Sequence, residues 1–335
     1  MTATNIIDIL ILGAGWTSAF LIPLCKRRNI SFAATTRSGS NDTIKFNFDQ
    51  NSTSDDDEQF AHLPDAKTVL ITFPITTPGA SKRLVRMYKK TRKNGSGDLR
   101  TGFIQLGATS IWGEPGASSR HGRNREGQKS TNTDSKPALK PAENRWYDRH
   151  SPYSRVERSD AEDELLALSP ETPTTVLNLA GLYGGDRSMR KWVGRVAPSK
   201  EVLKNKGSLH MVHGIDVARA ILAIHTQFDK SVGQRWILTD GRVYDWWDLS
   251  SAWGSGPTSN IDNNDNSPST NPSAVTTDSG PAEDRGPQAA WVRELMREMN
   301  VRALPRSIET LGRALDSREF WETFGLTPLK GRMEE

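Results

Sequence analysis

The sequence predicts an α/β fold in which helices cover both faces of a doubly wound parallel sheet. Apolar strand-like segments alternate with amphipathic helix-like segments over roughly the first 240 residues. This alternation is typical of right-handed crossovers between parallel strands. The first apolar segment also ends in a glycine-rich turn that opens a helix, as the first strand of such a sheet commonly does. No internal repeat indicates another architecture.

The predicted elements follow in order from the N-terminus. Residues 7–13, IDILILG, form an apolar run that we expect to be a fully buried strand. Residues 16–28 have a helical pattern, which Pro23 should kink. By the same criteria we expect further strands at 31–37, 67–74, 101–113, 174–184 and 234–241, and helices at 81–93, 161–168 and 213–228.

The alternation loosens after about residue 185. Amphipathic helices at 291–299 and 307–326 suit a smaller capping domain. We therefore expect a sheet domain over 1–180 and a smaller C-terminal α/β domain over 181–335, which would carry a substrate.

Two stretches look inserted into this pattern. Residues 114–145 and 254–288 are rich in Gly, Ser, Asn, Asp and Pro and have almost no large apolar side chains. Such segments cannot bury enough surface to offset the entropy of ordering them. We expect both to be mobile loops.

Composition and charge exclude several classes of protein. The net charge is +4, but residues 116–150 alone hold eight basic and four acidic residues, so the excess is local and does not favour a nucleic-acid partner. No apolar run approaches the roughly 20 residues that span a bilayer, and the N-terminus does not resemble a signal peptide. Cys25 is the single cysteine, which excludes an internal disulfide and suits a reducing compartment. We expect a cytoplasmic protein, and no residue grouping has metal-ligand spacing.

The turn after the first strand has the pattern of a dinucleotide-binding loop. In ILGAGWTSAF, Gly13 permits a tight turn and Gly15 lets the backbone approach a pyrophosphate, which the N-terminus of the following helix attracts. Ser18 replaces the third glycine of the usual pattern and is still small enough for close packing. We expect Trp16 and Thr17 to complete the loop. The alternative is a glycine turn that binds no ligand.

The end of the second predicted strand indicates which dinucleotide is bound. An NAD-selective protein usually has an acidic residue here for the ribose 2′-hydroxyl. In AATTRSGS the chain has Thr36, Arg37 and Ser38 instead. A guanidinium flanked by hydroxyls suits a 2′-phosphate, so we predict NADP(H) in preference to NAD(H). The alternative is a solvated surface arginine.

Taken together, these motifs resemble the extended short-chain dehydrogenase/reductase superfamily. They are most similar to its atypical branch of small NAD(P)-binding, nucleoside-diphosphate-sugar-epimerase-like proteins. The two inserted stretches fall outside the resemblance. The matching segments are ILGAGW, TTRSG, LITFPI, GATSIWG, HSPYSRVERSDAEDELLAL, LNLAGLYGGDR, HMVHGIDVARAI and RWILTDGRVYDWWDL.

The resemblance implies a Rossmann domain, a smaller C-terminal substrate domain and a nicotinamide site between them. It would place Phe73 and Pro74, in TFP, beside the adenosine ribose and phosphates. It would place the segment GLYGGDR near the nicotinamide and the substrate. Within that segment we expect Tyr183 and Arg187 to contact substrate, because loops after the carboxyl ends of such strands line the ligand crevice.

Active members of the family use a Ser or Thr, a Tyr and a Lys. This chain does not have the complete set at the matching positions. In GATSIWG the serine position falls on Ala108, with the hydroxyls of Thr109 and Ser110 close by. At the tyrosine two registers are open. One pairs Tyr153 with Glu157 in the lysine place, and the other pairs Ser154 with Arg158. Neither gives a Tyr–Lys pair.

A carboxylate beside a phenol raises the pKa of the phenol, so Tyr153 beside Glu157 would be a poor base. Tyr153 is either a proton donor in an altered mechanism or a packing residue before a helix. We expect His213, with Asp216 in the first helical turn, to be structural. We expect the aromatic segment 242–253 to be core and domain interface in preference to a sugar-stacking platform.

Two hypotheses follow for the function. The first is an NADP-dependent oxidoreductase that transfers hydride to or from a small carbonyl or alcohol, with protonation by Tyr153, Thr109, Ser110 or water. The second is a catalytically inactive dinucleotide-binding scaffold or redox sensor, which Ala108 and Glu157 favour. The residues identify neither the substrate nor the oligomeric state.

Overall fold

The computed structural model describes residues 6–54, 58–92, 100–113, 146–254 and 286–333. Of the two stretches predicted to be mobile loops, 114–145 lies wholly outside the described residues. The other lies outside them from 255 to 285. The chain divides into two compact units. The first comprises Met1–Gly185, His210–Arg242 and Leu315–Glu334, and the second comprises chiefly Asp186–Leu209 and Val243–Ala314.

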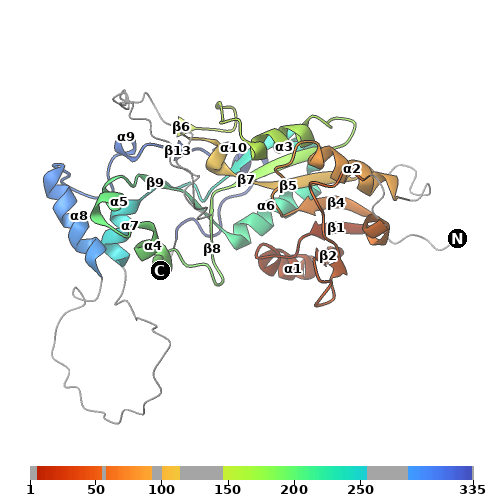
Figure 1. Ribbon diagram of the computed structural model, residues 1–335, viewed down its shortest axis with the longest axis horizontal. Helices are drawn as coiled ribbons and strands as arrows, with labels where there is room; N and C mark the ends of the chain where they lie inside the picture. The colour runs from red at the N-terminus through yellow and green to blue at the C-terminus, as the bar shows by residue number, and fades with distance from the viewer. Residues whose placement is uncertain (1–5, 55–57, 93–99, 114–145, 255–285, 334–335) are drawn as a thin grey trace, which may run out of the picture. The chain divides into compact units, whose positions relative to one another are not determined.

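The first unit contains a seven-stranded sheet in the order β11-β7-β5-β4-β1-β2-β3 (Figure 1). Every neighbouring pair is parallel. The chain starts at β1 in the middle, adds strands on one side and then returns to build the other side. This confirms the predicted doubly wound sheet. The strands are β1 (Ile7–Leu12), β2 (Phe32–Thr36), β3 (Ile44–Lys45), β4 (Ala66–Ile71), β5 (Gly102–Ala108), β7 (Thr174–Leu179) and β11 (Gln234–Leu238).

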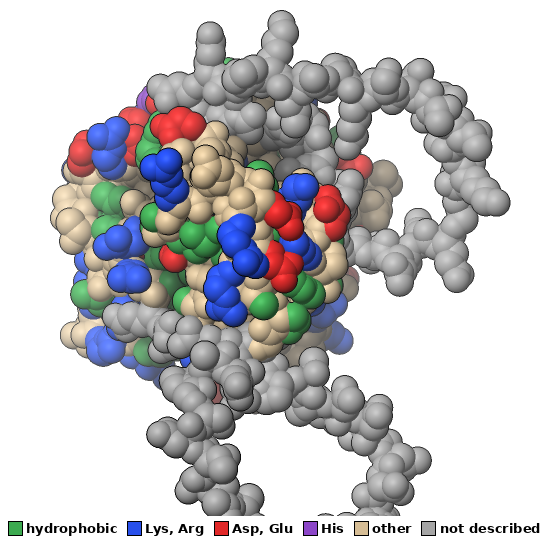
Figure 2. All heavy atoms as spheres, turned by 90° about the vertical axis from the view of Figure 1, so that its left-hand side faces the viewer, with side chains coloured by type: hydrophobic (Ala, Val, Ile, Leu, Met, Phe, Trp, Pro, Cys, Tyr) green, Lys and Arg blue, Asp and Glu red, His purple; other side chains and the backbone are tan. Residues whose placement is uncertain are grey.

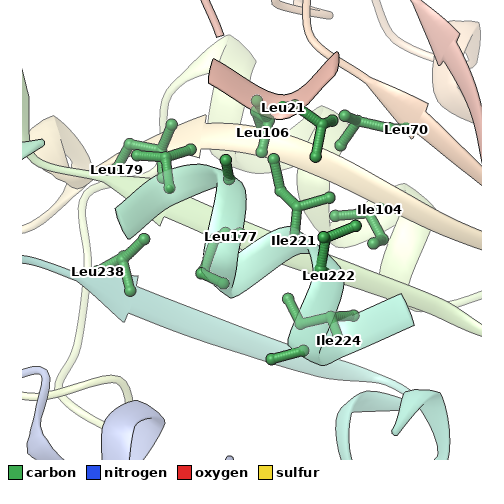
Figure 3. Packing of buried hydrophobic residues seen from close by; sticks show 14 of the residues in the cluster. Leu21, Leu70, Ile104, Leu106, Leu177, Leu179, Ile221, Leu222, Ile224 and Leu238 are labelled. Carbon is green, nitrogen blue, oxygen red and sulfur yellow. The ribbon is translucent and has the colours of Figure 1, made fainter. Parts of the chain in front are cut away.

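Helices cover both faces of the sheet because successive strand residues alternate between two apolar clusters. On one face lie α1 (Ser18–Arg27) and α6 (Gly214–Thr226), and on the other lie α2 (Ala80–Lys90) and α3 (Glu157–Leu166). Figure 3 shows the first cluster, in which Ile221, Leu222 and Ile224 of α6 lie among leucines and isoleucines of the strands. This burial on both faces explains why the strands are rich in apolar residues.

Two predicted strands are shorter than expected. The segment 101–113 leaves the sheet after Ala108 and turns into a short 3₁₀ helix, η2 (Thr109–Ile111). The segment 174–184 leaves the sheet after β7 and continues as β8 (Gly181–Tyr183), which pairs in parallel with β10 (Met211–His213). The chain therefore forms loops at the carboxyl ends of β5 and β7, where a site would lie.

The prediction of one amphipathic helix over 307–326 is wrong. The segment contains α9 (Ile308–Leu311), β13 (Ala314–Leu315) and α10 (Arg318–Thr323). Gly312, with φ +93°, directly follows α9, a conformation that commonly ends helices and suits glycine. The apolar residues of α10 pack in the first unit, against the cluster that contains α1 and α6. Residues 210–242, also from the range expected for the smaller domain, belong to the first unit as well.

The second unit has its own apolar core around Trp247, which packs with Leu203, Val292 and Leu295. These residues come from α5 (Lys200–Lys204), α7 (Trp246–Trp253) and α8 (Pro287–Glu298). The unit also contains α4 (Val193–Val196) and the antiparallel pair β9 (Ser208–Leu209) and β12 (Tyr244–Asp245). The tryptophans of the aromatic segment 242–253 are buried, as core residues are.

On the face that Figure 2 shows, basic and acidic side chains are interspersed. Lys200 of α5 bonds to Glu294 and Glu298 of α8, each at 2.6 Å. In the part of the chain that the structure describes, no helix is long and apolar enough to cross a membrane.

Candidate functional site

The predicted cofactor-binding residues lie in loops at one edge of the sheet. All strands are parallel, so the loops that follow β1, β2, β4, β5 and β7 meet at their carboxyl ends. The strand order reverses between β1 and β4. In open α/β sheets ligands bind outside the carboxyl ends of the strands at such a reversal.

Gly13 opens the loop after β1 in a conformation that only glycine adopts readily, with φ +95°. A Cβ atom here would lie 2.7 Å from Oγ1 of Thr72, at the end of β4. The Thr72 hydroxyl donates to the carbonyl oxygens of Leu12 at 3.0 Å and Gly13 at 2.5 Å. On the other side, Gly13 N–H donates to Oγ1 of Thr35 at 3.0 Å. The side chains of Thr35 in β2 and of Thr72 directly after β4 therefore fix the loop. The sequence placed the TFP segment near the cofactor, but it did not predict that these two threonines hold Gly13.

The next residues form an open, polar helix start. Gly15 is exposed, and a Cβ atom on it would meet no heavy atom within 4 Å. Thr17, at the N-cap of α1, makes no side-chain capping bond, and the first turn has no acidic residue. Ser18 is only 4% exposed, and its Oγ has no hydrogen-bond partner among the described residues. An uncapped helix N-terminus with an unsatisfied buried hydroxyl fits an anionic group such as a pyrophosphate.

Trp16 connects this loop to the segment that follows β7. Its indole Nε1 donates to the carbonyl oxygen of Gly184 at 3.3 Å. Its ring packs edge-on against Phe20, which packs against His213, which packs in turn against Tyr183, with centroids 4.8, 5.4 and 5.0 Å apart. The structure thus brings Trp16 and Tyr183, predicted from separate motifs, into one aromatic cluster.

Arg37 is exposed after the end of β2. Its predicted hydroxyl neighbours bond within their own loop. Thr36 Oγ1 accepts from Gly39 N–H at 2.9 Å, and Ser38 Oγ lies 2.9 Å from Oγ of Ser40. These bonds order the turn that presents the guanidinium.

A second cation lies beside this turn. Lys45 of β3 is the register partner of Thr36 and is exposed. Sequence reasoning missed it because β3 has only two residues and gives no periodic signal.

Phe73 and Pro74 follow Thr72 at the end of β4. The Phe73 carbonyl accepts from Nε2 of Gln105 at 3.0 Å, and its ring is stacked 6.2 Å from Phe48. Pro74 is exposed. A narrow crevice beside it is lined by Pro74, Ile75, Ser81, Gln105, Leu106, Arg158 and Glu162.

Both residues that the two registers offer contact the loop after β5, and the Tyr153 ring packs edge-on against Trp112 with centroids 6.0 Å apart. Thr109 is buried and Ser110 exposed in η2. Ser154 N–H donates to the carbonyl of Ile111 at 2.8 Å, and Ser154 Oγ donates to that of Gly113 at 3.3 Å. Ser154 therefore contacts the loop through its own bonds. Arg158, four residues later, lines the crevice described above.

Tyr153 has a different environment. Its hydroxyl donates to Oδ1 of Asp163 at 2.6 Å, and the Arg235 guanidinium lies 4.7 Å from its ring centroid. Burial and the bond to Asp163 raise the pKa of Tyr153, against the opposing charge of Arg235. The carboxylate beside the phenol is thus Asp163, whereas Glu157 is exposed at the start of α3.

Behind Tyr153 lies a buried polar network that the sequence did not reveal. Arg235 of β11 pairs with Glu162 of α3 and, at 2.9 Å, with Asp163. Asn178 of β7 donates to Glu162 Oε2 at 3.1 Å and accepts from Arg235 at 3.2 Å. A Cβ atom on Gly107 would lie 2.3 Å from Nδ2 of Asn178, so the network also requires a glycine in β5.

The remaining candidates have structural partners. His213 Nδ1 accepts from Ile215 N–H at 3.1 Å and so caps α6, as expected. The Tyr183 hydroxyl lies 3.0 and 3.1 Å from the carbonyl oxygens of Lys330 and Arg332. Arg187 belongs to the second unit. Across the described ranges, no group of His, Cys, Asp and Glu could hold a metal ion.

The fold resembles that of solved NAD(P)-binding enzymes at low sequence identity. The yeast methylglyoxal/isovaleraldehyde reductase Gre2, complexed with NADPH, matches with a TM-score of 0.53 and 14% identity, covering 96% of this chain and 93% of that one. RMD from Pseudomonas aeruginosa, complexed with NADPH, matches at 0.51 and 10%, with coverage of 96% and 93%. MoeE5, in complex with UDP-glucose and NAD, matches at 0.51 and 12%, with coverage of 98% and 94%.

No family model and no curated protein matches the sequence. The likeness to these solved structures nevertheless confirms the predicted fold, an α/β Rossmann-like fold with a parallel central sheet.

Proposed function

We propose that this chain binds NADP(H) and acts as an oxidoreductase of the extended short-chain dehydrogenase/reductase type on a small carbonyl or alcohol. The observation that carries the proposal is the loop after β1. There the positive φ of Gly13, the open space at Gly15 and the unsatisfied hydroxyl of Ser18 occur together. When bound, the nicotinamide would supply or accept the hydride.

Residues of the three central loops would hold the dinucleotide. The backbone at Gly13 and Gly15, with the start of α1, would face the pyrophosphate. Phe73 and Pro74 would lie beside the adenosine. A 2′-phosphate would meet Arg37 and Lys45, two exposed cations at the ends of β2 and β3.

The proton that accompanies the hydride would come from Tyr153, Thr109, Ser110 or water. The Tyr153 hydroxyl donates a hydrogen bond to Asp163, and its raised pKa makes it a weaker acid than an ordinary tyrosine. Arg158 would stand in the lysine place in the register that starts from Ser154. It would supply a positive charge at the crevice, but it cannot release a proton.

A catalytically inactive dinucleotide-binding scaffold is the second candidate. Two observations favour it. Ala108 offers no hydroxyl at the end of β5, and the hydroxyl of Tyr153 is engaged by Asp163. The dinucleotide site would be the same in both cases, so only turnover separates the two functions.

The first test is calorimetric titration of the full chain with NADPH and with NADH, followed by the same titrations of Arg37→Ala. We expect tight NADPH binding, weaker NADH binding, and a loss of about tenfold in NADPH affinity alone in the variant. Binding of neither nucleotide would refute the proposal. A subsequent screen of carbonyl substrates with NADPH separates the enzyme from the scaffold.

A further inference from the structure

The last described residues of the chain, 326–333, form a strap whose backbone makes several hydrogen bonds to buried and charged side chains. Asp216, in the first turn of α6, is fully buried. One carboxylate oxygen accepts from Leu329 N–H at 2.7 Å and the other from Lys330 N–H at 2.8 Å. A buried carboxylate without hydrogen-bond donors would be costly. The strap supplies such donors to Asp216, and the same bonds hold the strap in place.

Basic side chains add to this attachment. Arg219 pairs with Asp216 at 2.7 Å and also donates to the carbonyl oxygen of Thr327 at 2.8 Å. Arg242 Nε donates to the carbonyl oxygen of Gly331 at 2.5 Å. The strap is thus anchored at both of its ends by charged donors from the first unit.

The Tyr183 hydroxyl completes the attachment through the carbonyl oxygens of Lys330 and Arg332. Tyr183 is 7% exposed, and its ring packs on His213. From there the aromatic cluster continues through Phe20 to Trp16 of the dinucleotide loop. A continuous set of hydrogen bonds and ring contacts therefore connects the strap to the proposed site.

We propose that the strap sets the position of the Tyr183–Gly184 segment against the dinucleotide loop, with Asp216 and Tyr183 as positioning residues. Docking of the strap and binding of NADPH then stabilise each other. This inference rests on the proposed dinucleotide site. Because such coupling is reciprocal, the nucleotide must hold the strap more firmly and loosening the strap must weaken the nucleotide.

The test combines hydrogen exchange with calorimetry on the full chain. We expect saturating NADPH to slow amide exchange in the 326–333 segment at least tenfold in the wild type. Tyr183→Phe keeps the ring but loses both bonds to the strap, and we expect it to raise the NADPH dissociation constant about tenfold. Tyr88→Phe is the matched control, since it loses one bond to the Pro64 carbonyl elsewhere in the same unit. Its affinity should stay within twofold.

Equal affinities in Tyr183→Phe and Tyr88→Phe, or strap exchange that NADPH leaves unchanged, would overturn the coupling. Asp216→Asn, compared with wild type without nucleotide, reports separately whether the strap docks as described, because it should speed exchange at Leu329 and Lys330. If the strap docks but no nucleotide binds, the proposed function and the coupling both fail. If nucleotide binds but the strap exchanges freely, only the coupling fails.

Discussion

The indole of Trp16 donates a hydrogen bond to the carbonyl oxygen of Gly184, which lies 168 residues further along the chain. Trp16 follows β1, and Gly184 follows β8, the short strand after β7. In the sheet β1 and β7 are separated by β4 and β5. The contact therefore joins loops from strands that are not neighbours, and it links the proposed phosphate site to the segment expected near the nicotinamide.

Gly13 and Gly15 should respond differently to alanine. In Gly13→Ala the new Cβ meets Thr72 Oγ1 at a positive φ, so we expect a loss of about 2–4 kcal/mol in the free energy of unfolding. In Gly15→Ala the Cβ enters open space, so stability should stay within about 0.5 kcal/mol. Its NADPH affinity should nevertheless fall at least tenfold, because the backbone can no longer approach a phosphate.

Urea unfolding and calorimetric titration of the two variants check this prediction. The Gly15→Ala variant is its own control for folding, since its unfolding curve should overlay that of the wild type. Unchanged NADPH affinity in Gly15→Ala would mean that the open space does not receive the nucleotide.

Lys45→Ala should weaken NADPH binding about threefold and leave NADH binding unchanged. An exposed ammonium near a phosphate contributes about 0.2–1 kcal/mol, and salt should reduce the difference. Titrations at low and high salt measure both effects. Lys26→Ala removes the same charge at the far end of α1 and should have no effect. A loss of NADH affinity equal to that of NADPH would place Lys45 away from the 2′-phosphate.

The element order was predictable because local periodicity and glycine turns record it directly. The side chains that hold a loop from neighbouring strands were not predictable from the sequence. Thr35 and Thr72 hold Gly13 from 22 and 59 residues away, and no local pattern marks such partners. The prediction of a helix at 307–326 was wrong because the apolar residues of two short helices and an intervening strand have together the spacing of one amphipathic helix.

The register around Tyr153 illustrates a second limit. Tyr153 and Ser154 are adjacent, so motif spacing alone leaves both open as the residue at the site. The choice depends on hydrogen bonds made in three dimensions, by Ser154 to the loop after β5 and by Tyr153 to Asp163. Tyr183 was likewise found from its motif, but its bonds to the C-terminal strap were not predictable.

Tyr153→Phe should lower the free energy of unfolding by about 1–2 kcal/mol and leave NADPH affinity unchanged. The change removes a hydrogen bond to a charged, partly buried carboxylate. Urea unfolding and calorimetry measure the two quantities. If instead the variant is as stable as wild type and any carbonyl reduction found in the screen falls more than 100-fold, Tyr153 is the proton donor.

The ion pair at the start of β1 should make the free energy of unfolding depend on pH in the acid range. Burial alone would raise the pKa of Asp8, but the bonds from Lys67 and Ser31 outweigh it and lower that pKa to about 2. A pKa depressed in the folded state contributes stability above the ordinary value of 3.8, and this contribution is lost as pH falls towards 2. In Asp8→Asn, the unfolding free energy should therefore fall less between pH 6 and pH 2 than it does in the wild type. The difference should be only about 1 kcal/mol, because Lys67 is exposed. Urea unfolding midpoints from pH 6 to pH 2 measure this difference. The same pH dependence in the variant and the wild type would contradict the prediction.

Removing one partner of the buried Arg235–Glu162 pair should be far more costly than removing both charges. Arg235 and Glu162 are 6% and 3% exposed. Arg235→Met leaves a buried carboxylate with Asn178 as its remaining described donor, so we expect a loss of about 3–5 kcal/mol in unfolding free energy. The double variant Arg235→Met/Glu162→Gln should recover at least half of that loss, since the neutral amide still bonds to Asn178.

Urea unfolding of the two single variants and the double variant gives the coupling free energy. Arg155→Met is the matched control, because Arg155 pairs with Asp163 from an exposed position, and it should cost less than about 1 kcal/mol. If the losses of unfolding free energy in the two single variants add up in the double variant, Arg235 does not stabilise the buried Glu162 carboxylate.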